Sequence, residues 1–101
     1  MSEAPEDIRT MEDLRNYIHE TLCNRENLLR DQSPMTELEL TRQGRVCGRQ
    51  YCVHGPRSVR LGAIWASDHN IVYFYDAAGE RYLKVKLPHR LTVAAGSADA
   101  A

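Results

Sequence analysis

The fold is decided by residues 58–87, which read SVRLGAIWASDHNIVYFYDAAGERYLKVKL. Three runs of apolar, β-branched and aromatic residues are separated there by two short segments, 67–70 and 76–79, that are rich in turn-forming residues. Short connections between consecutive strands require antiparallel pairing. The stretch therefore predicts three strands of an antiparallel meander, at residues 58–66, 70–76 and 80–87.

A fourth strand is expected immediately before this stretch, at residues 45–53, because another β-rich run ends there at the turn sequence His-Gly-Pro-Arg. Gly79 occupies the position at which a type I turn followed by a left-handed residue needs glycine. The second half of the chain is thus predicted to be a four-stranded antiparallel sheet.

The first half of the chain predicts one amphipathic helix, from about Met11 to Cys23. Thr10 is placed as its N-cap, and Asp13 follows at the third helical position, as in a capping box. Apolar residues recur at helical spacing: Met11, Leu14, Ile18 and Leu22. The sequence leaves open whether the helix extends to residue 31. Asn24 and Asn27 disfavour this extension, and Pro34 ends any helix that reaches it.

The connector at residues 24–40 is ambiguous between helix, strand and loop. Leu38 and Leu40 alternate with polar residues, which also allows a short strand. A helix about 10–12 Å wide cannot cover a four-stranded sheet nearly 20 Å across. Three arrangements complete the core: the connector folds over the sheet, the sheet curls into a half-barrel, or a second copy of the chain covers it.

Length and composition indicate one α+β domain. The chain has 101 residues, 43% apolar and 27% charged, which suits a single globular unit at residues 10–91. Residues 1–9 are expected to be a flexible acidic lead-in, and residues 92–101 a disordered tail. The sequence has no apolar run of membrane-spanning length and no export signal, so we expect no membrane association and a cytoplasmic protein with reduced cysteines.

Charge is distributed unevenly along the chain. Ten acids and four arginines up to residue 40 give −6, whereas nine bases and four acids after it give +5. Residues 41–67 contain no acid at all. This asymmetry favours either an anionic partner for the second half or neutralisation of the sheet by the acidic helix.

Strand alternation predicts one apolar and one basic face for the sheet. Leu61, Ala63 and Trp65 share the core face of the second strand, and the opposite face is expected to be basic with interleaved tyrosine. Such a face is typical of single-stranded nucleic-acid binding, although the pI of about 6.4 counts against it. The residues expected to contact nucleic acid are Arg60, Tyr82, Lys84, Lys86, Arg49 and Arg57.

The cysteines carry two further hypotheses. Cys47, Cys52 and His54 are ligand types that zinc accepts, but the second knuckle of a structural zinc site is missing, so we expect no metal and no other cofactor. Arg45 and Arg49 flank Cys47 on the strand and favour a reactive thiolate there. No histidine is fixed near Cys47 by the sequence, so the chain offers no catalytic constellation and is expected not to be an enzyme.

The sequence does not determine a function. It favours a small non-enzymatic module that binds a protein partner or a second copy of itself, with Val72 and Phe74 near the interface. The alternative is the single-stranded nucleic-acid binding described above.

Overall fold

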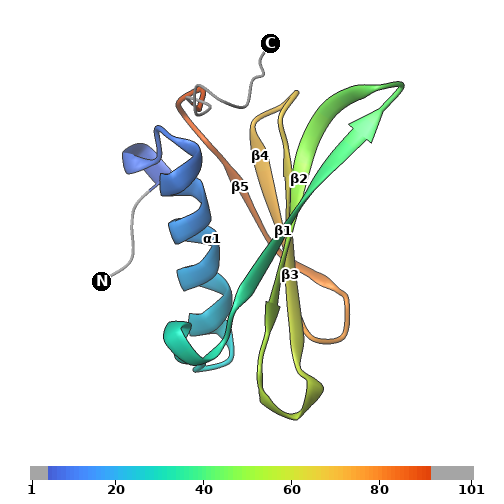
Figure 1. The fold of residues 1–101 in the computed structure, drawn as a ribbon. Helices are drawn as coiled ribbons and strands as arrows, with labels where there is room; N and C mark the ends of the chain where they lie inside the picture. Colours follow the sequence, from blue (N-terminus) through green and yellow to red (C-terminus); the bar gives the residue numbers. More distant parts are fainter. Residues whose placement is uncertain (1–4, 92–101) are drawn as a thin grey trace.

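The computed structural model describes residues 5–91, which form one α-helix packed against one five-stranded antiparallel sheet (Figure 1). The helix, α1, spans Met11–Arg25. The strands are β1 Met35–Arg42, β2 Arg45–His54, β3 Arg60–Ala66, β4 Ile71–Tyr75 and β5 Arg81–Lys86. Their spatial order equals their chain order, so the sheet is an open meander with β3 at its centre. The predicted α+β class is confirmed.

The sheet has one strand more than the sequence predicted. β1 occupies the second half of the ambiguous connector and pairs with β2 along its whole length. The two strands are joined through Gln43 and Gly44, whose φ angles are +54° and +80°. Two consecutive left-handed residues are what a two-residue β-hairpin turn needs. The connector thus widens the sheet, which is not closed into a barrel.

Local signals at the two ends of α1 explain its bounds. Thr10 Oγ1 accepts a hydrogen bond from the Asp13 amide, and the Asp13 carboxylate accepts one from the Thr10 amide, which confirms the capping box. The extension to residue 31 does not form. The helix ends at Arg25, and Asn27 then adopts a left-handed φ of +57°.

Part of the acidic lead-in belongs to the fold. Pro5–Asp7 form a turn of 3-10 helix, η1, and Ile8 is fully buried against the core. The Ile8 side chain therefore anchors this segment to the core, and the packed part of the chain begins before the predicted domain boundary at residue 10. Residues 1–4 and the predicted tail at 92–101 lie outside the described residues.

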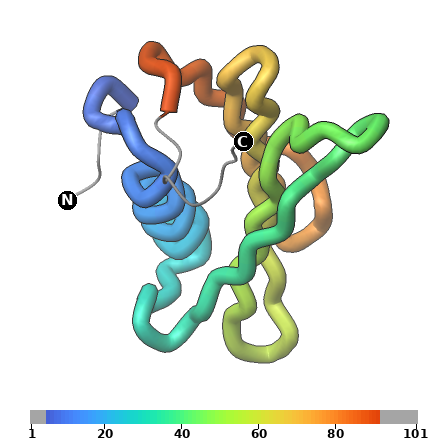
Figure 2. The backbone as a smooth tube through the Cα atoms, turned by 45° about the horizontal axis from the view of Figure 1, so that its top comes forward, coloured from blue at the N-terminus to red at the C-terminus, as the bar shows by residue number. Residues whose placement is uncertain are grey.

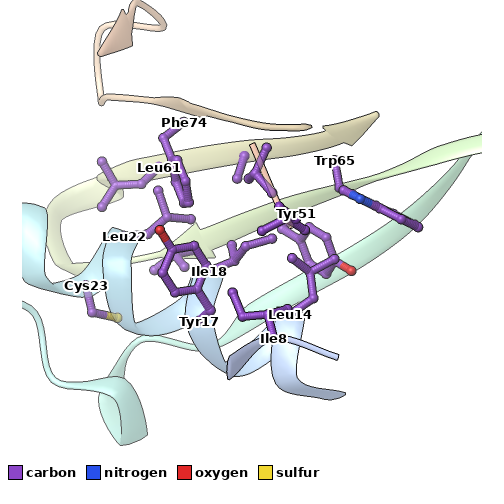
Figure 3. Close-up of a cluster of buried hydrophobic side chains, with 14 of the residues drawn as sticks. Ile8, Leu14, Tyr17, Ile18, Leu22, Cys23, Tyr51, Leu61, Trp65 and Phe74 are labelled. Atoms are coloured by element: carbon purple, nitrogen blue, oxygen red, sulfur yellow. The ribbon is translucent and has the colours of Figure 1, made fainter. Parts of the chain in front are cut away.

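The core is a single layer of buried side chains between α1 and one face of the sheet (Figure 3). The backbone of α1 lies on that side of the sheet (Figure 2). The Tyr17 ring of α1 meets the Phe74 ring of β4 edge to face, with the ring centroids 6.0 Å apart. The strands contribute their alternate residues to this layer: Tyr51, Val53, Leu61, Ala63, Trp65, Val72 and Phe74. This confirms that Leu61, Ala63 and Trp65 share the core face.

The α1-facing side of β1 is apolar at Met35, which packs against the core, and polar at Glu37 and Glu39, so the rest of the strand needs no helix over it. Glu37 Oε2 accepts hydrogen bonds from the Tyr51 hydroxyl at 2.9 Å and from Arg49 Nη1 at 3.0 Å. Arg15 of α1 adds an ion pair to the same oxygen at 3.6 Å. Burial, reinforced by the Glu37 carboxylate, raises the pKa of Tyr51 far above its ordinary value. The cluster of Arg15, Glu37, Arg49 and the Tyr51 hydroxyl therefore borders the core at the β1 side of the sheet, which α1 does not cover.

A bulge changes the face on which Tyr82 lies. Phe74 pairs with Leu83 and Tyr75 with Arg81, which leaves Tyr82 as the extra residue of β5. Its ring packs beside Phe74 and under the Arg25 guanidinium, whose carbon lies 4.2 Å from the ring centroid. The prediction that Tyr82 shares the basic face with Lys84 and Lys86 is therefore wrong.

We expect Tyr82→Phe to leave stability unchanged or to raise it by up to about 1 kcal/mol. The Tyr82 hydroxyl is buried without a hydrogen-bond partner in the described part of the chain, and removing an unpaired buried polar group carries no loss. Tyr51→Phe is the matched control. It deprives Glu37 of a donor and is expected to cost about 1.5–3 kcal/mol. Urea denaturation measures both, and a loss above about 1 kcal/mol for Tyr82→Phe would contradict the structure.

Candidate functional site: the outer face of the sheet

The side of the sheet opposite α1 carries no other helix or strand of residues 5–91 (Figure 1). We call this side the outer face. It is formed by the strand residues that alternate with the core residues, and the strand pairing aligns them in three rows across the sheet. The rows are Thr36, Cys52, Gly62, Tyr75 and Arg81; Leu38, Gln50, Ile64, Tyr73 and Lys84; and Leu40, Gly48, Ala66, Ile71 and Lys86.

The chemistry of the outer face changes from β1 to β5. Its β1 side is aliphatic, and the Leu38 side chain there is 62% exposed. Tyr73 and Tyr75 follow on β4, and the β5 side is basic. Arg60 adds a fourth cation at the start of β3. None of the outward strand positions carries a carboxylate.

The positively charged side chains of the outer face have no acidic partner within residues 5–91. Arg60 and Lys84 are exposed and form no ion pair within residues 5–91. Lys86 Nζ donates a hydrogen bond to the His69 carbonyl at 2.9 Å, which leaves its charge without a counter-ion. The Arg81 guanidinium carbon lies 5.2 Å from the Tyr73 ring centroid. The face therefore presents positive charge beside an apolar and aromatic surface.

A hollow of about 400 Å³ lies over Gly62 on this face. Gly62 and Ile64 form part of its lining, and Arg60 and Tyr75 lie beside them. Asp76 also borders the hollow, but its carboxylate is engaged elsewhere. Oδ1 accepts hydrogen bonds from two amides of its own turn, and Oδ2 lies 3.9 Å from Arg25. Arg60 is thus the charged group that the hollow offers to a ligand.

Besides Tyr82, two more of the predicted nucleic-acid contacts, Arg49 and Arg57, are not on the outer face. Arg49 pairs across β2 and β3 with the core residue Trp65, and it binds Glu37 and Glu39 on the α1 side at 3.0 and 3.5 Å. Arg57 lies in the short η3 segment Pro56–Ser58, outside the strands. With Tyr82 turned toward α1, the structure retains Arg60, Lys84 and Lys86 of the original set.

The residues predicted to form an interface lie inside the core. Val72 and Phe74 are both fully buried in the layer beneath α1. The apolar third predicted strand, β4, reaches the outer surface through Tyr73 and Tyr75 instead. Since α1 already covers Val72 and Phe74, they are not available to a second chain, and the predicted interface at these positions is wrong.

The structure does not bring Cys47, Cys52 and His54 together. Cys47 is the unpaired residue of a bulge between β1 and β2, whereas Cys52 lies opposite Gly62. Four residues of strand lie between Cys47 and Cys52, so their backbones are on the order of 15 Å apart, too far for two ligands of one metal ion. Within residues 5–91, no group of three or more metal-ligating side chains is placed to hold an ion.

Burial separates the three cysteines into two reactivity classes. Cys23 is 1% exposed, and burial raises the pKa of its thiol, which lowers its thiolate fraction at neutral pH. Cys47 and Cys52 are partly exposed. We expect iodoacetamide to modify Cys47 and Cys52 in the folded protein at least about tenfold faster than Cys23. Peptide mapping by mass spectrometry measures the rates, and equal rates in the folded protein would contradict this placement of α1.

Comparisons with known proteins give no family for this chain: no protein-family model, no curated protein and no solved structure matches it. No helix among residues 5–91 has the length and apolar character needed to span a membrane.

Sequence reasoning missed Leu38, Leu40 and Gly62 as parts of the site. The two leucines lie in the connector whose structure the sequence leaves ambiguous, and the sequence signal for their strand is the Gln43-Gly44 turn before the next strand. Alternation with Leu61 and Ala63 places Gly62 on the face opposite the core, but a glycine in a strand does not reveal a hollow until its neighbours are placed.

Proposed function

We propose that this protein is a non-enzymatic interaction module, and that its outer face binds an acidic amphipathic segment of a protein partner. One observation carries the proposal: an uncovered sheet face combines an aliphatic and tyrosine-rich surface with four cations and no outward carboxylate. Uncovered apolar surface of this kind is typical of binding sites, and its charge selects a partner of opposite sign. A cytoplasmic location is part of the same proposal.

Charge argues for a different protein rather than a second copy on this face. If two outer faces met with like strands opposed, Lys84 and Lys86 would lie against the same residues of the other copy. If β5 met β1, these lysines would cover Leu38 and Leu40. Both arrangements bury cations without a counter-charge, which is costly. A partner that carries its own carboxylates removes this cost.

The aliphatic half of the outer face favours a protein over nucleic acid. Leu38, Leu40, Ile64 and Ile71 offer apolar area that phosphates and sugars do not cover, whereas an amphipathic peptide does. Tyr73 and Tyr75 suit either ligand. Single-stranded nucleic acid is therefore the competing outcome of the test below.

The test is a titration of the isotopically labelled chain, followed by its amide NMR signals. The probes are the peptide Glu-Glu-Leu-Phe-Glu-Glu, the peptide Lys-Lys-Leu-Phe-Lys-Lys in which lysine replaces every glutamate, and single-stranded oligothymidylate. We expect the acidic peptide to shift the signals of outer-face residues. We expect Lys84→Glu to lower the affinity for this peptide at least about tenfold. Arg45→Glu, at the exposed tip of the β1–β2 hairpin, is the matched control and is expected to leave binding nearly unchanged.

Two results would overturn the proposal. One is that the acidic peptide shifts no outer-face signal or binds no better than the lysine peptide. The other is that oligothymidylate shifts these signals in place of the acidic peptide, with affinity that falls steeply as salt is raised.

A further inference from the structure

Two glycines face outward near the middle of the sheet, and only one of them is required by the backbone. A Cβ at Gly48 would lie 2.1 Å from the Trp65 carbonyl oxygen, so β2 and β3 leave no room for a side chain there. A Cβ at Gly62 would meet only the Tyr51 carbonyl oxygen, at an ordinary contact distance of 3.5 Å. The fold therefore explains Gly48 and does not explain Gly62.

A glycine in the middle of the central strand weakens the sheet unless something uses the space. Glycine costs conformational entropy in a strand and adds no packing, and it often marks the place where a ligand approaches the backbone closely. Gly62 has no left-handed φ that would favour glycine. The space above it is the hollow on the outer face, between Cys52 of β2 and Tyr75 of β4.

The residues that line this hollow indicate the chemistry of the ligand that it would bind. Ile64 and the Tyr75 ring supply apolar and aromatic contact, while Gln50 supplies an amide at the β2 side. Arg60 stands at one end without an ion pair within the described chain, and Asp76 is held by Arg25 and its own turn. The hollow thus combines an apolar floor with one free guanidinium.

We infer that the hollow over Gly62 is an anchor site: it takes one large apolar side chain of the partner segment, and Arg60 pairs with a carboxylate beside that side chain. This inference rests on the proposed function and adds the position and chemistry of the central contact. A buried apolar anchor next to a paired arginine is the arrangement in which few residues carry most of the binding free energy.

The experiment compares variants that fill the hollow with variants that add the same atoms elsewhere. Gly62→Val, and the smaller change Gly62→Ala, are expected to keep or raise the thermal midpoint of unfolding. They are also expected to lower the affinity for the peptide Glu-Glu-Leu-Phe-Glu-Glu, for Gly62→Val at least about tenfold. Ala66→Val is the control on the same face of β3, roughly 13 Å along the strand. Since Ala66 belongs to the outer face but not to the lining of the hollow, Ala66→Val is expected to weaken peptide binding by about threefold at most, clearly less than Gly62→Val.

A second pair of variants tests the charge. Arg60→Gln is expected to weaken the acidic peptide about threefold to tenfold and to reduce the salt dependence of binding. Arg45→Gln makes the same change of net charge at the hairpin tip and is expected to have little effect. Replacing Leu-Phe in the peptide by Ala-Ala is expected to abolish the shift of the Gly62 amide signal.

The outcomes separate this inference from the proposed function. If the peptide shifts the signals of Tyr73 and Lys84 but binds Gly62→Val as tightly as the unaltered chain, the anchor site is wrong and the wider binding face stands. If no outer-face signal shifts, both fall. If Ala66→Val weakens binding as much as Gly62→Val, the anchor lies elsewhere on the face and this inference is overturned.

Discussion

Gly48→Ala is expected to lower the free energy of unfolding by about 3 kcal/mol or more, which is a large part of the stability of a domain of this size. The added Cβ would lie 2.1 Å from the Trp65 carbonyl oxygen, and the obstacle is backbone rather than a flexible side chain. The two strands must separate locally, which disturbs the ladder between Gly48 and Ala66. Urea denaturation followed by circular dichroism measures the loss.

Gly62→Ala is the matched control for Gly48→Ala. Both substitutions add one methyl group to the outer face of a sheet strand, but at Gly62 the new Cβ makes only an ordinary contact. We expect Gly62→Ala to raise stability by about 0.5–1 kcal/mol, because alanine loses less backbone entropy than glycine in a strand. Equal losses for the two variants would contradict the close approach of β2 and β3 at Gly48.

The sequence predicts the helix and the β3–β5 meander well because their signals are local. Thr10 and Asp13 form the predicted cap, and Gly79 adopts the predicted left-handed φ, at +82°. Apolar alternation in β3 places Leu61 and Trp65 on the core face. These features depend on residues a few positions apart, so the chain encodes them without knowledge of its tertiary contacts.

The missed features depend on contacts that are distant in sequence. β1 lacks a clear core-facing row, because Glu37 and Glu39 occupy the positions next to Tyr51 and Arg49. Without β1 the sequence offers Arg49 no carboxylate partner and predicts a nucleic-acid contact there, whereas the structure pairs it with Glu37 and Glu39. Strict alternation placed Tyr82 outward, and the register shift between Phe74 and Tyr75 turns it inward. The outer face therefore keeps the two tyrosines of β4, Tyr73 and Tyr75, and loses Tyr82.

Asn70→Ala is expected to cost about 3 kcal/mol, because Asn70 joins the β3–β4 turn to the segment after β5. Its side chain is buried, and Oδ1 accepts a hydrogen bond from Trp65 Nε1 at 2.9 Å. Nδ2 donates to the carbonyls of Leu87 and His89 at 3.3 and 2.7 Å. The φ of Asn70 is +56°, a left-handed conformation that asparagine tolerates better than alanine.

Two further variants separate the backbone from the hydrogen bonds. Asn70→Gly relieves the left-handed strain but leaves the buried Trp65 Nε1–H unpaired, so it is expected to cost about 1–3 kcal/mol. Asp68→Ala, in the same turn, alters no side-chain hydrogen bond found in the described chain and is expected to change stability by less than about 0.5 kcal/mol. Urea denaturation measures all three variants. If Asn70→Gly is as stable as the unaltered chain, the hydrogen bonds to Trp65, Leu87 and His89 do not hold the turn, and the loss in Asn70→Ala arises from backbone strain alone.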